Sequence, residues 1–225
     1  MKGYLPAVIG MLLYLNTLPN GFVYDDHPAI EQNPCVQIGG WERLLQADFW
    51  GTPLRSPSSH HSFRPLATLT LRLNRVLDPA GGARGFHAAN VLLHGATTGA
   101  LWSLAAHLLG PGRSATALLS ALFFAVHPVN TEAVAYCVGR ADVLAAVLGL
   151  MGMRAHGEAV SALSAARDWR CASYAIGRIL LGLGLLAAAL ASKETALMFL
   201  PACAIFDATR RRGDLRAEVR AMAME

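Results

Sequence analysis

About six apolar segments, separated by polar stretches, constrain the fold of this chain more than any other feature of its sequence. They occupy residues 4–18, 87–109, 115–128, 141–153, 175–191 and 196–208. Hydrophobic residues make up 54% of the 225 residues and charged residues 15%, whereas a soluble domain has about 25% charged residues. Because a helix needs about 20 apolar residues to cross a bilayer, 87–109 is long enough, and the shorter 115–128 and 141–153 either cross fully or form a re-entrant pair. The sequence therefore predicts an all-α polytopic membrane protein.

Basic residues predict the orientation of these segments. Segment 4–18 follows Lys2, and no small-residue cleavage site comes after it, so we interpret it as an uncleaved first span with a cytoplasmic N-terminus. The loops 110–114, 154–174 and 209–225 then lie in the cytoplasm, and together with Lys2 they contain 10 of the 19 basic residues. This bias follows the positive-inside rule and places the long first loop in the lumen.

The first loop, residues 21–86, is too long for a plain connection between spans. It contains the stretch "FRPLATLTLRLNRVL", which predicts a helix with one apolar face. The residues on that face are Leu66, Leu69, Leu73, Val76 and Leu77. Arg72 and Arg75 point away from it, which is the pattern of an amphipathic helix lying in the membrane interface.

In this topology, ionisable residues from five separate clusters reach the luminal side. They are Asp25, Asp26, His60, His61, Arg64, His127, Glu132, Arg140, Asp142, Lys193 and Glu194. Each cluster by itself is explained as an anchor for the end of a helix. Because ionisable groups within a membrane are unfavourable and mark functional sites, their joint placement instead favours an active site at the membrane boundary.

The residue types suggest which chemistry such a site would perform. The adjacent carboxylates Asp25 and Asp26 suit a general base, and Arg64, Arg140 and Lys193 suit a phosphate group. Luminal substrates that carry a phosphate and a lipid anchor are typically polyprenyl-phosphate sugars.

Simpler interpretations stay open for several of these residues. "YDDHP" is also ordinary chemistry for a helix cap and turn, and His60 and His61 fit a solvated loop better than a metal site. The four cysteines form no CxxC pair, so we predict no metal, and free buried thiols are favoured over a disulfide between Cys35 and Cys137. The basic residues are scattered, which argues against a nucleic-acid partner.

Six blocks of the sequence resemble a known family. They read "FVYDDHPAI", "ADFWG", "SHHSFRPLATLTLRLN", "FHAANVLLH", "LFFAVHPVNTEAVAYCVGRADVLA" and "SKET". In order and spacing they resemble the N-terminal region of the transmembrane and tetratricopeptide repeat-containing proteins, which are O-mannosyltransferases of the endoplasmic reticulum membrane with a GT-C fold. The resemblance covers about residues 3–212 and departs mildly from the family pattern at Asn130 and at the last residue of "SKET".

The resemblance implies an inverting transfer of mannose from dolichyl phosphate mannose to Ser or Thr of luminal, cadherin-type acceptor proteins. The base would be Asp25 or Asp26, which the resemblance does not rank. Cations would stabilise the leaving dolichyl phosphate, and no metal or other cofactor is implied. The remaining residues that meet on the luminal side, His60, His61, His127, Glu132, Asp142 and Glu194, would support the site.

The resemblance also predicts how the chain is divided. Residues 1–212 would form the N-terminal part of a GT-C-like transmembrane domain, and 213–225 a cytoplasmic tail. No 34-residue repeat is present, so we interpret the chain as an N-terminal fragment whose tetratricopeptide repeats are missing. The alternative function is a non-catalytic scaffold of the endoplasmic reticulum membrane that binds other membrane proteins through small-residue spans such as "GLGLLAAALA".

Overall fold

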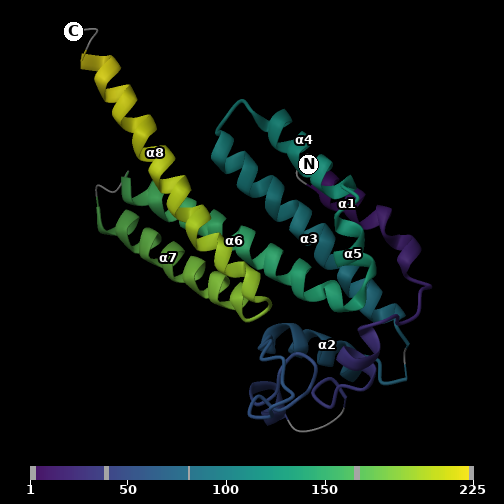
Figure 1. The fold of residues 1–225 in the computed structure, drawn as a ribbon. Helices are drawn as coiled ribbons and strands as arrows, with labels where there is room; N and C mark the ends of the chain where they lie inside the picture. Colours follow the sequence, from purple (N-terminus) through teal and green to yellow (C-terminus); the bar gives the residue numbers. More distant parts are fainter. Residues whose placement is uncertain (1–3, 38–40, 81, 165–167, 223–225) are drawn as a thin grey trace.

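The chain folds into a bundle of helices with a compact loop region at one end (Figure 1). The computed structural model describes residues 4–37, 41–80, 82–164 and 168–222, with side chains as far as Arg210. Its α-helices are α1 (Tyr4–Leu13), α2 (Pro65–Leu77), α3 (Arg84–Leu109), α4 (Ser114–Val126), α5 (Asn130–Ala135), α6 (Arg140–Ser164), α7 (Trp169–Leu190) and α8 (Phe199–Met222). The described ranges contain no β-strand, only an isolated bridge between Ala47 and Pro53, so the predicted all-α class is confirmed.

Helix α3 lies at the centre of the bundle and packs against α1, α4 and α6, and α7 lies along α6 (Figure 1). Small residues allow the close contact between α6 and α7. A Cβ atom on Gly152 would lie 2.9 Å from the side chain of Leu186 and 3.4 Å from the carbonyl oxygen of Gly182. Larger residues at this crossing would therefore force the two helices apart.

Two helices among the described residues are long and apolar enough to cross a membrane. They cover Cys137–Ser164 and Trp169–Leu190, and the apolar helices Tyr4–Thr17 and Ser114–Val126 are shorter. The turn between α3 and α4 and the facing ends of α6 and α7 lie at the end of the bundle opposite the loop region (Figure 1). This arrangement fits a membrane bundle, while the count of about six spans and the GT-C arrangement stay predictions.

The prediction that residues 154–174 form a loop is wrong, while their cytoplasmic location stays a prediction. Helix α6 continues to Ser164, so most of this polar stretch is helical. Ion pairs explain why the polar residues do not end the helix. Arg154 pairs with Glu158 one turn later at 2.8 Å, and Arg178 of α7 also pairs with Glu158. A charge that is paired in this way is far less costly inside a bundle than an isolated one.

The first loop forms a small folded unit around a core of its own. Ile30, Phe49 and Leu71 are buried there together with Phe86 of α3. The predicted helix within the loop is confirmed as α2, with Leu73, Val76 and Leu77 exposed on its apolar face. Arg72 points away from that face as predicted, but into the protein, where it is 3% exposed and donates a hydrogen bond to the carbonyl of Cys35.

Buried side chains also settle a smaller prediction. Cys35 and Cys137 are both buried free thiols, as favoured from the sequence. In addition, His94 of α3 lies 3.3 Å from the carbonyl oxygen of Ala125 in α4, so this histidine links two helices.

Candidate active site

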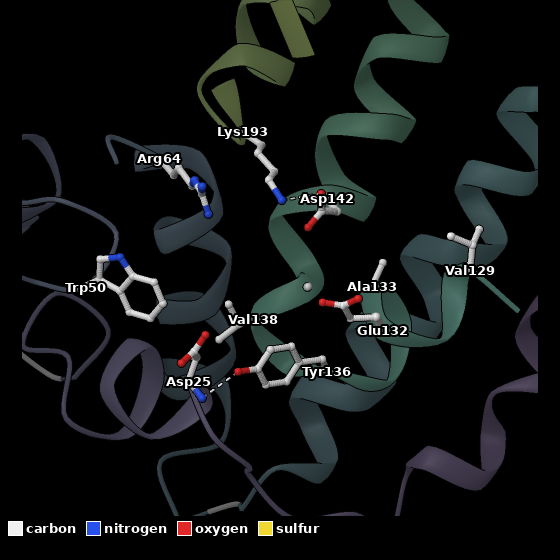
Figure 2. A pocket seen from close by; sticks show the side chains of 11 residues that line it. Asp25, Trp50, Arg64, Val129, Glu132, Ala133, Tyr136, Val138, Asp142 and Lys193 are labelled. Atoms are coloured by element: carbon white, nitrogen blue, oxygen red, sulfur yellow. Dashed lines mark hydrogen bonds and ion pairs between the residues drawn. The ribbon is translucent and has the colours of Figure 1, made fainter. Parts of the chain in front are cut away.

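A polar hollow of about 420 Å³ opens where the first loop meets the ends of α5, α6 and α7 (Figure 2). We call it the central hollow. Its lining residues are Asp25, Trp50, Arg64, Val129, Glu132, Ala133, Tyr136, Val138, Gly139, Asp142 and Lys193. Five of these belong to the predicted luminal set, and they come from segments far apart in the sequence. Figure 2 shows the side chains of Arg64 and Lys193 on one side of the hollow and those of Asp25 and Tyr136 on the other.

The two adjacent aspartates have different environments. The Asp26 side chain is fully buried and accepts hydrogen bonds from the backbone N–H of Val138 at 2.9 Å and of Val23 at 3.2 Å. It therefore fastens the first loop to the turn before α6. Burial raises the pKa of the Asp26 carboxyl, and these backbone N–H groups counteract that shift.

Asp25, in contrast, is exposed and lines the central hollow. Its backbone N–H donates a hydrogen bond to the Tyr136 hydroxyl oxygen at 2.7 Å. Burial raises the pKa of Tyr136 to about 12, so this hydroxyl keeps its proton at neutral pH and remains able to donate it in a hydrogen bond. Tyr136 thus holds the backbone that carries the exposed carboxylate.

Both cations of the central hollow are paired with carboxylates. Arg64 donates two hydrogen bonds to Glu194, from Nε to Oε2 at 2.9 Å and from Nη2 to Oε1 at 2.5 Å. This contact lowers the pKa of Glu194 to about 2. Lys193 Nζ lies 2.6 Å from Asp142 Oδ1. The guanidinium of Arg64 and the ammonium of Lys193 lie on one wall and can both bind phosphate oxygens once they release the carboxylates of Glu194 and Asp142.

Arg140 does not lie at the central hollow, although the sequence grouped it with Arg64 and Lys193. It is 1% exposed, and protein acceptors occupy its guanidinium. Those acceptors are Asn90 Oδ1 at 2.9 Å, the Phe86 carbonyl at 2.9 Å, the Thr70 carbonyl at 3.0 Å and Asn74 Oδ1. Arg140 therefore joins α2, α3 and α6, and its role in this structure is to hold the loop region on the bundle.

The predicted histidines lie outside the central hollow. His60 and His61 line a neighbouring hollow together with Glu194, which connects the two hollows through its ion pair with Arg64. His127 follows α4, and its Nδ1 accepts a hydrogen bond from the backbone N–H of Val129 at 3.2 Å. In the described part of the chain, no three His, Cys, Asp or Glu side chains lie close enough together to hold a metal ion.

Sequence reasoning missed Tyr136 and Trp50. Both are aromatic residues without charge, so a search for ionisable clusters passes over them. Tyr136 stands within the block "HPVNTEAVAYCVGRAD", and a polar aromatic residue between two predicted site residues was the only available signal.

Known proteins resemble this chain along most of its length. Protein O-mannosyl-transferase Tmtc2 of Drosophila melanogaster is 43% identical over 208 residues, which are 90% of this chain and 21% of that protein. Protein O-mannosyl-transferase TMTC2 of Homo sapiens is 44% identical over 150 residues, 65% of this chain and 17% of that protein. Protein O-mannosyl-transferase TMTC4 of Mus musculus is 34% identical over 214 residues, 88% of this chain and 28% of that protein. The chain thus spans less than a third of the length of these curated relatives. No protein-family model and no solved structure matches it.

Proposed function

Because the chain belongs to the TMTC family of protein O-mannosyl-transferases, we propose that it forms part of a membrane enzyme that transfers mannose from dolichyl phosphate mannose to Ser or Thr hydroxyls of luminal, cadherin-type proteins. The enzyme is a multi-pass GT-C protein of the endoplasmic reticulum with a cytoplasmic N-terminus. The observation that carries the proposal is the central hollow, where the exposed carboxylate Asp25 faces the cations Arg64 and Lys193.

Asp25 is the general base of the proposed reaction. Its carboxylate takes the proton of the acceptor hydroxyl while the hydroxyl oxygen forms a bond to the anomeric carbon of mannose. The bond between that carbon and the phosphate oxygen breaks, and its electron pair leaves with dolichyl phosphate. Attack from the side opposite the phosphate inverts the configuration at the anomeric carbon.

Arg64 and Lys193 stabilise the negative charge that develops on the leaving phosphate. Before the donor binds, Glu194 and Asp142 neutralise these cations at 2.5 and 2.6 Å. The donor phosphate replaces the carboxylates as their partner. Positioned cations of this kind act on the transition state without needing to reorganise around it.

Asp26 has a positioning role, because its side chain is fully buried and bonded to backbone N–H groups. The two aspartates that the sequence left unranked are therefore separated by their surroundings. A proton acceptor must reach the substrate, and among the two only Asp25 lines the hollow.

Mannose transfer by membranes that carry single variants tests this assignment. We would compare wild type, Asp25→Asn, Asp26→Asn and the control Asp78→Asn, which changes an exposed aspartate after α2. The donor is radiolabelled dolichyl phosphate mannose, and the acceptor is a Thr-containing peptide. The same aspartate changes are also made at the aligned positions of full-length Drosophila Tmtc2.

Asp25→Asn removes the base, so it should lower mannose transfer by about 10²- to 10⁴-fold while the abundance of the protein stays unchanged. Asp26→Asn should lower abundance or thermal stability, and the control should change neither. Full activity in Asp25→Asn would refute the assignment. A non-catalytic scaffold, the alternative function, would show no transfer even in wild type, and the full-length protein would show none as well.

A further inference from the structure

One aromatic residue of the central hollow has no part in the proposed reaction. Trp50 is half-buried and lines the hollow together with Asp25 and Arg64. In Figure 2 its indole ring lies between the side chains of these two residues. The charged groups of the hollow favour a polar ligand, whereas an indole ring gains most from contact with an apolar surface. A ligand that satisfies both is polar at its edges and apolar on one face.

A buried carboxylate fixes the turn that carries Trp50. Asp48 is 2% exposed, and each of its oxygens accepts two hydrogen bonds. The donors to Oδ1 are the backbone N–H groups of Trp50 at 3.0 Å and Thr52 at 2.9 Å, and the donors to Oδ2 are the Ser59 hydroxyl at 2.8 Å and the His60 N–H at 3.0 Å. Hydrogen bonds to an ionised acceptor are among the stronger ones, so the turn has little freedom to move.

Aromatic neighbours hold the side chain of Trp50 as well. The Phe49 ring lies 5.5 Å from it and the His60 ring 6.2 Å, both edge to face. The next residue, Gly51, has a φ of 83°, and a Cβ atom there would overlap the side-chain oxygen of Asn33. The indole ring therefore occupies its place in the hollow before any ligand binds, which lowers the cost of binding one.

We propose that Trp50 binds the mannosyl group of the donor by stacking against the apolar face of the sugar ring. The inference rests on the proposed function, which places the donor phosphate at Arg64 and Lys193 and the attacking hydroxyl at Asp25. The mannosyl ring must then lie between them, beside Trp50. The face of a mannopyranose ring opposite its axial 2-hydroxyl presents C–H bonds, which pack on an indole while the hydroxyl groups stay toward the polar side of the hollow.

Two lipids that differ only by the mannosyl group test this contact without any need for mannose transfer. The dissociation constants of dolichyl phosphate mannose and of dolichyl phosphate are measured for the full chain in lipid nanodiscs. Trp50→Leu removes the aromatic ring, and Trp50→Phe keeps a smaller one against Phe49. The matched control Trp169→Leu removes a tryptophan that is 72% exposed at the start of α7, outside the hollow.

The fluorescence of Trp50 gives a second measurement of the same contact. The chain has four tryptophans, so Trp41, Trp102 and Trp169 are replaced with phenylalanine and Trp50 is left as the single emitter. A sugar ring that packs on the indole excludes water from it. Dolichyl phosphate mannose should therefore shift the emission of Trp50 to shorter wavelength, and dolichyl phosphate should shift it less.

Trp50→Leu should raise the Kd for dolichyl phosphate mannose about tenfold, which is the size of one good aromatic contact, and should leave the Kd for dolichyl phosphate unchanged. Trp50→Phe should raise the first Kd about threefold, and Trp169→Leu should change neither. Equal effects of Trp50→Leu on the two lipids, equal emission shifts, or no binding of the mannosyl lipid to wild type would overturn the inference.

Failure of this inference and failure of the proposed function give different results. Selective binding of the mannosyl lipid through Trp50, with no mannose transfer by this chain or by full-length Drosophila Tmtc2, would refute the proposed function alone. Mannose transfer by a chain whose Trp50→Leu variant binds both lipids as wild type does would refute the role of Trp50 alone.

Discussion

Replacing Arg140 with methionine should open the contact between the loop region and the bundle. The guanidinium donates to acceptors on α2 and α3, and those on α3 are the carbonyl of Phe86 and the side chain of Asn90. Asn90 in turn donates to the carbonyl of Tyr136 at 3.0 Å. Methionine fills a similar volume but leaves these buried acceptors without their donor. Each unsatisfied buried group costs about 1–3 kcal/mol, and carbonyls that keep their hydrogen bonds within a helix cost less. We therefore expect the free energy that holds the loop region on the bundle to fall by about 2–4 kcal/mol.

The thiol of Cys137 measures this opening directly, because it is fully buried and lies only three residues before Arg140. In a chain whose other three cysteines are alanine, we would follow the rate at which a soluble thiol reagent labels Cys137. A loss of about 2–4 kcal/mol predicts labelling that is about 30- to 700-fold faster in Arg140→Met, at 1.4 kcal/mol for each factor of ten. The control is Arg84→Met, which removes an exposed arginine at the start of α3.

Equal labelling of Cys137 in Arg140→Met and in Arg84→Met would refute the structural role of Arg140. If that result came with weaker binding of dolichyl phosphate, Arg140 would be a donor-binding residue, as the sequence alone suggested.

Three further predictions concern the central hollow. Tyr136→Phe removes the oxygen that accepts the Asp25 N–H, so kcat for mannose transfer should fall about tenfold while KM stays unchanged, as initial rates would show. Gly139→Ala should lower the free energy of unfolding by about 1–3 kcal/mol, because its Cβ would lie 2.5 Å from a backbone carbonyl oxygen, whereas the control Gly184→Ala meets nothing within 4 Å. Glu194→Gln should lower the melting temperature most above pH 4.5, where the ion pair is fully formed. Because the pKa of Glu194 is lowered to about 2, the difference in melting temperature should vanish as the pH falls from 4.5 toward 2. The corresponding loss in the free energy of unfolding should not exceed about 1 kcal/mol, because the ion pair is so exposed.

Specific results would contradict these three predictions. A change in KM alone for Tyr136→Phe would mean that the hydroxyl binds substrate rather than positions the base. Equal stability of Gly139→Ala and Gly184→Ala would mean that the turn before α6 can move. A melting difference for Glu194→Gln that is the same at pH 7 and pH 2 would mean that the ion pair does not titrate as described.

Local patterns were sufficient to predict several elements of the fold. The apolar face at Leu73 and Leu77 predicted α2, and the short loop 110–114 predicted the turn between α3 and α4, where Gly110 and Gly112 adopt positive φ. The polar gap between the apolar segments 175–191 and 196–208 predicted the break after α7, where Lys193 stands before a short 3₁₀ helix. Each of these signals depends on residues close together in the sequence.

The sequence could not predict features for which long-range contacts decide the environment of a side chain. Arg140 looks like an ion-binding residue near a span end, but its acceptors come from two other helices that no local spacing reveals. Asp25 and Asp26 are the same residue type in the sequence, and the burial of Asp26 against the backbone N–H groups of Val138 and Val23 distinguishes them. The helical continuation past Arg154 depends on its ion pair with Glu158. Hydropathy alone counts both residues as polar and therefore predicts a loop.

The central claim is that Asp25 and the two cations face one luminal compartment, and the sidedness of four positions tests it most directly. Single cysteines would replace Ser58 and Thr195 near the central hollow, and Gly112 and Ser164 at the opposite end of the bundle, in a chain without its native cysteines. Intact endoplasmic reticulum vesicles are treated with a membrane-impermeant maleimide before and after permeabilisation. The account predicts labelling of Gly112→Cys and Ser164→Cys in intact vesicles, and of Ser58→Cys and Thr195→Cys only after permeabilisation. Labelling of either Ser58→Cys or Thr195→Cys from the cytoplasmic side would contradict the account, because the base and the cations could then not meet on a luminal sugar donor.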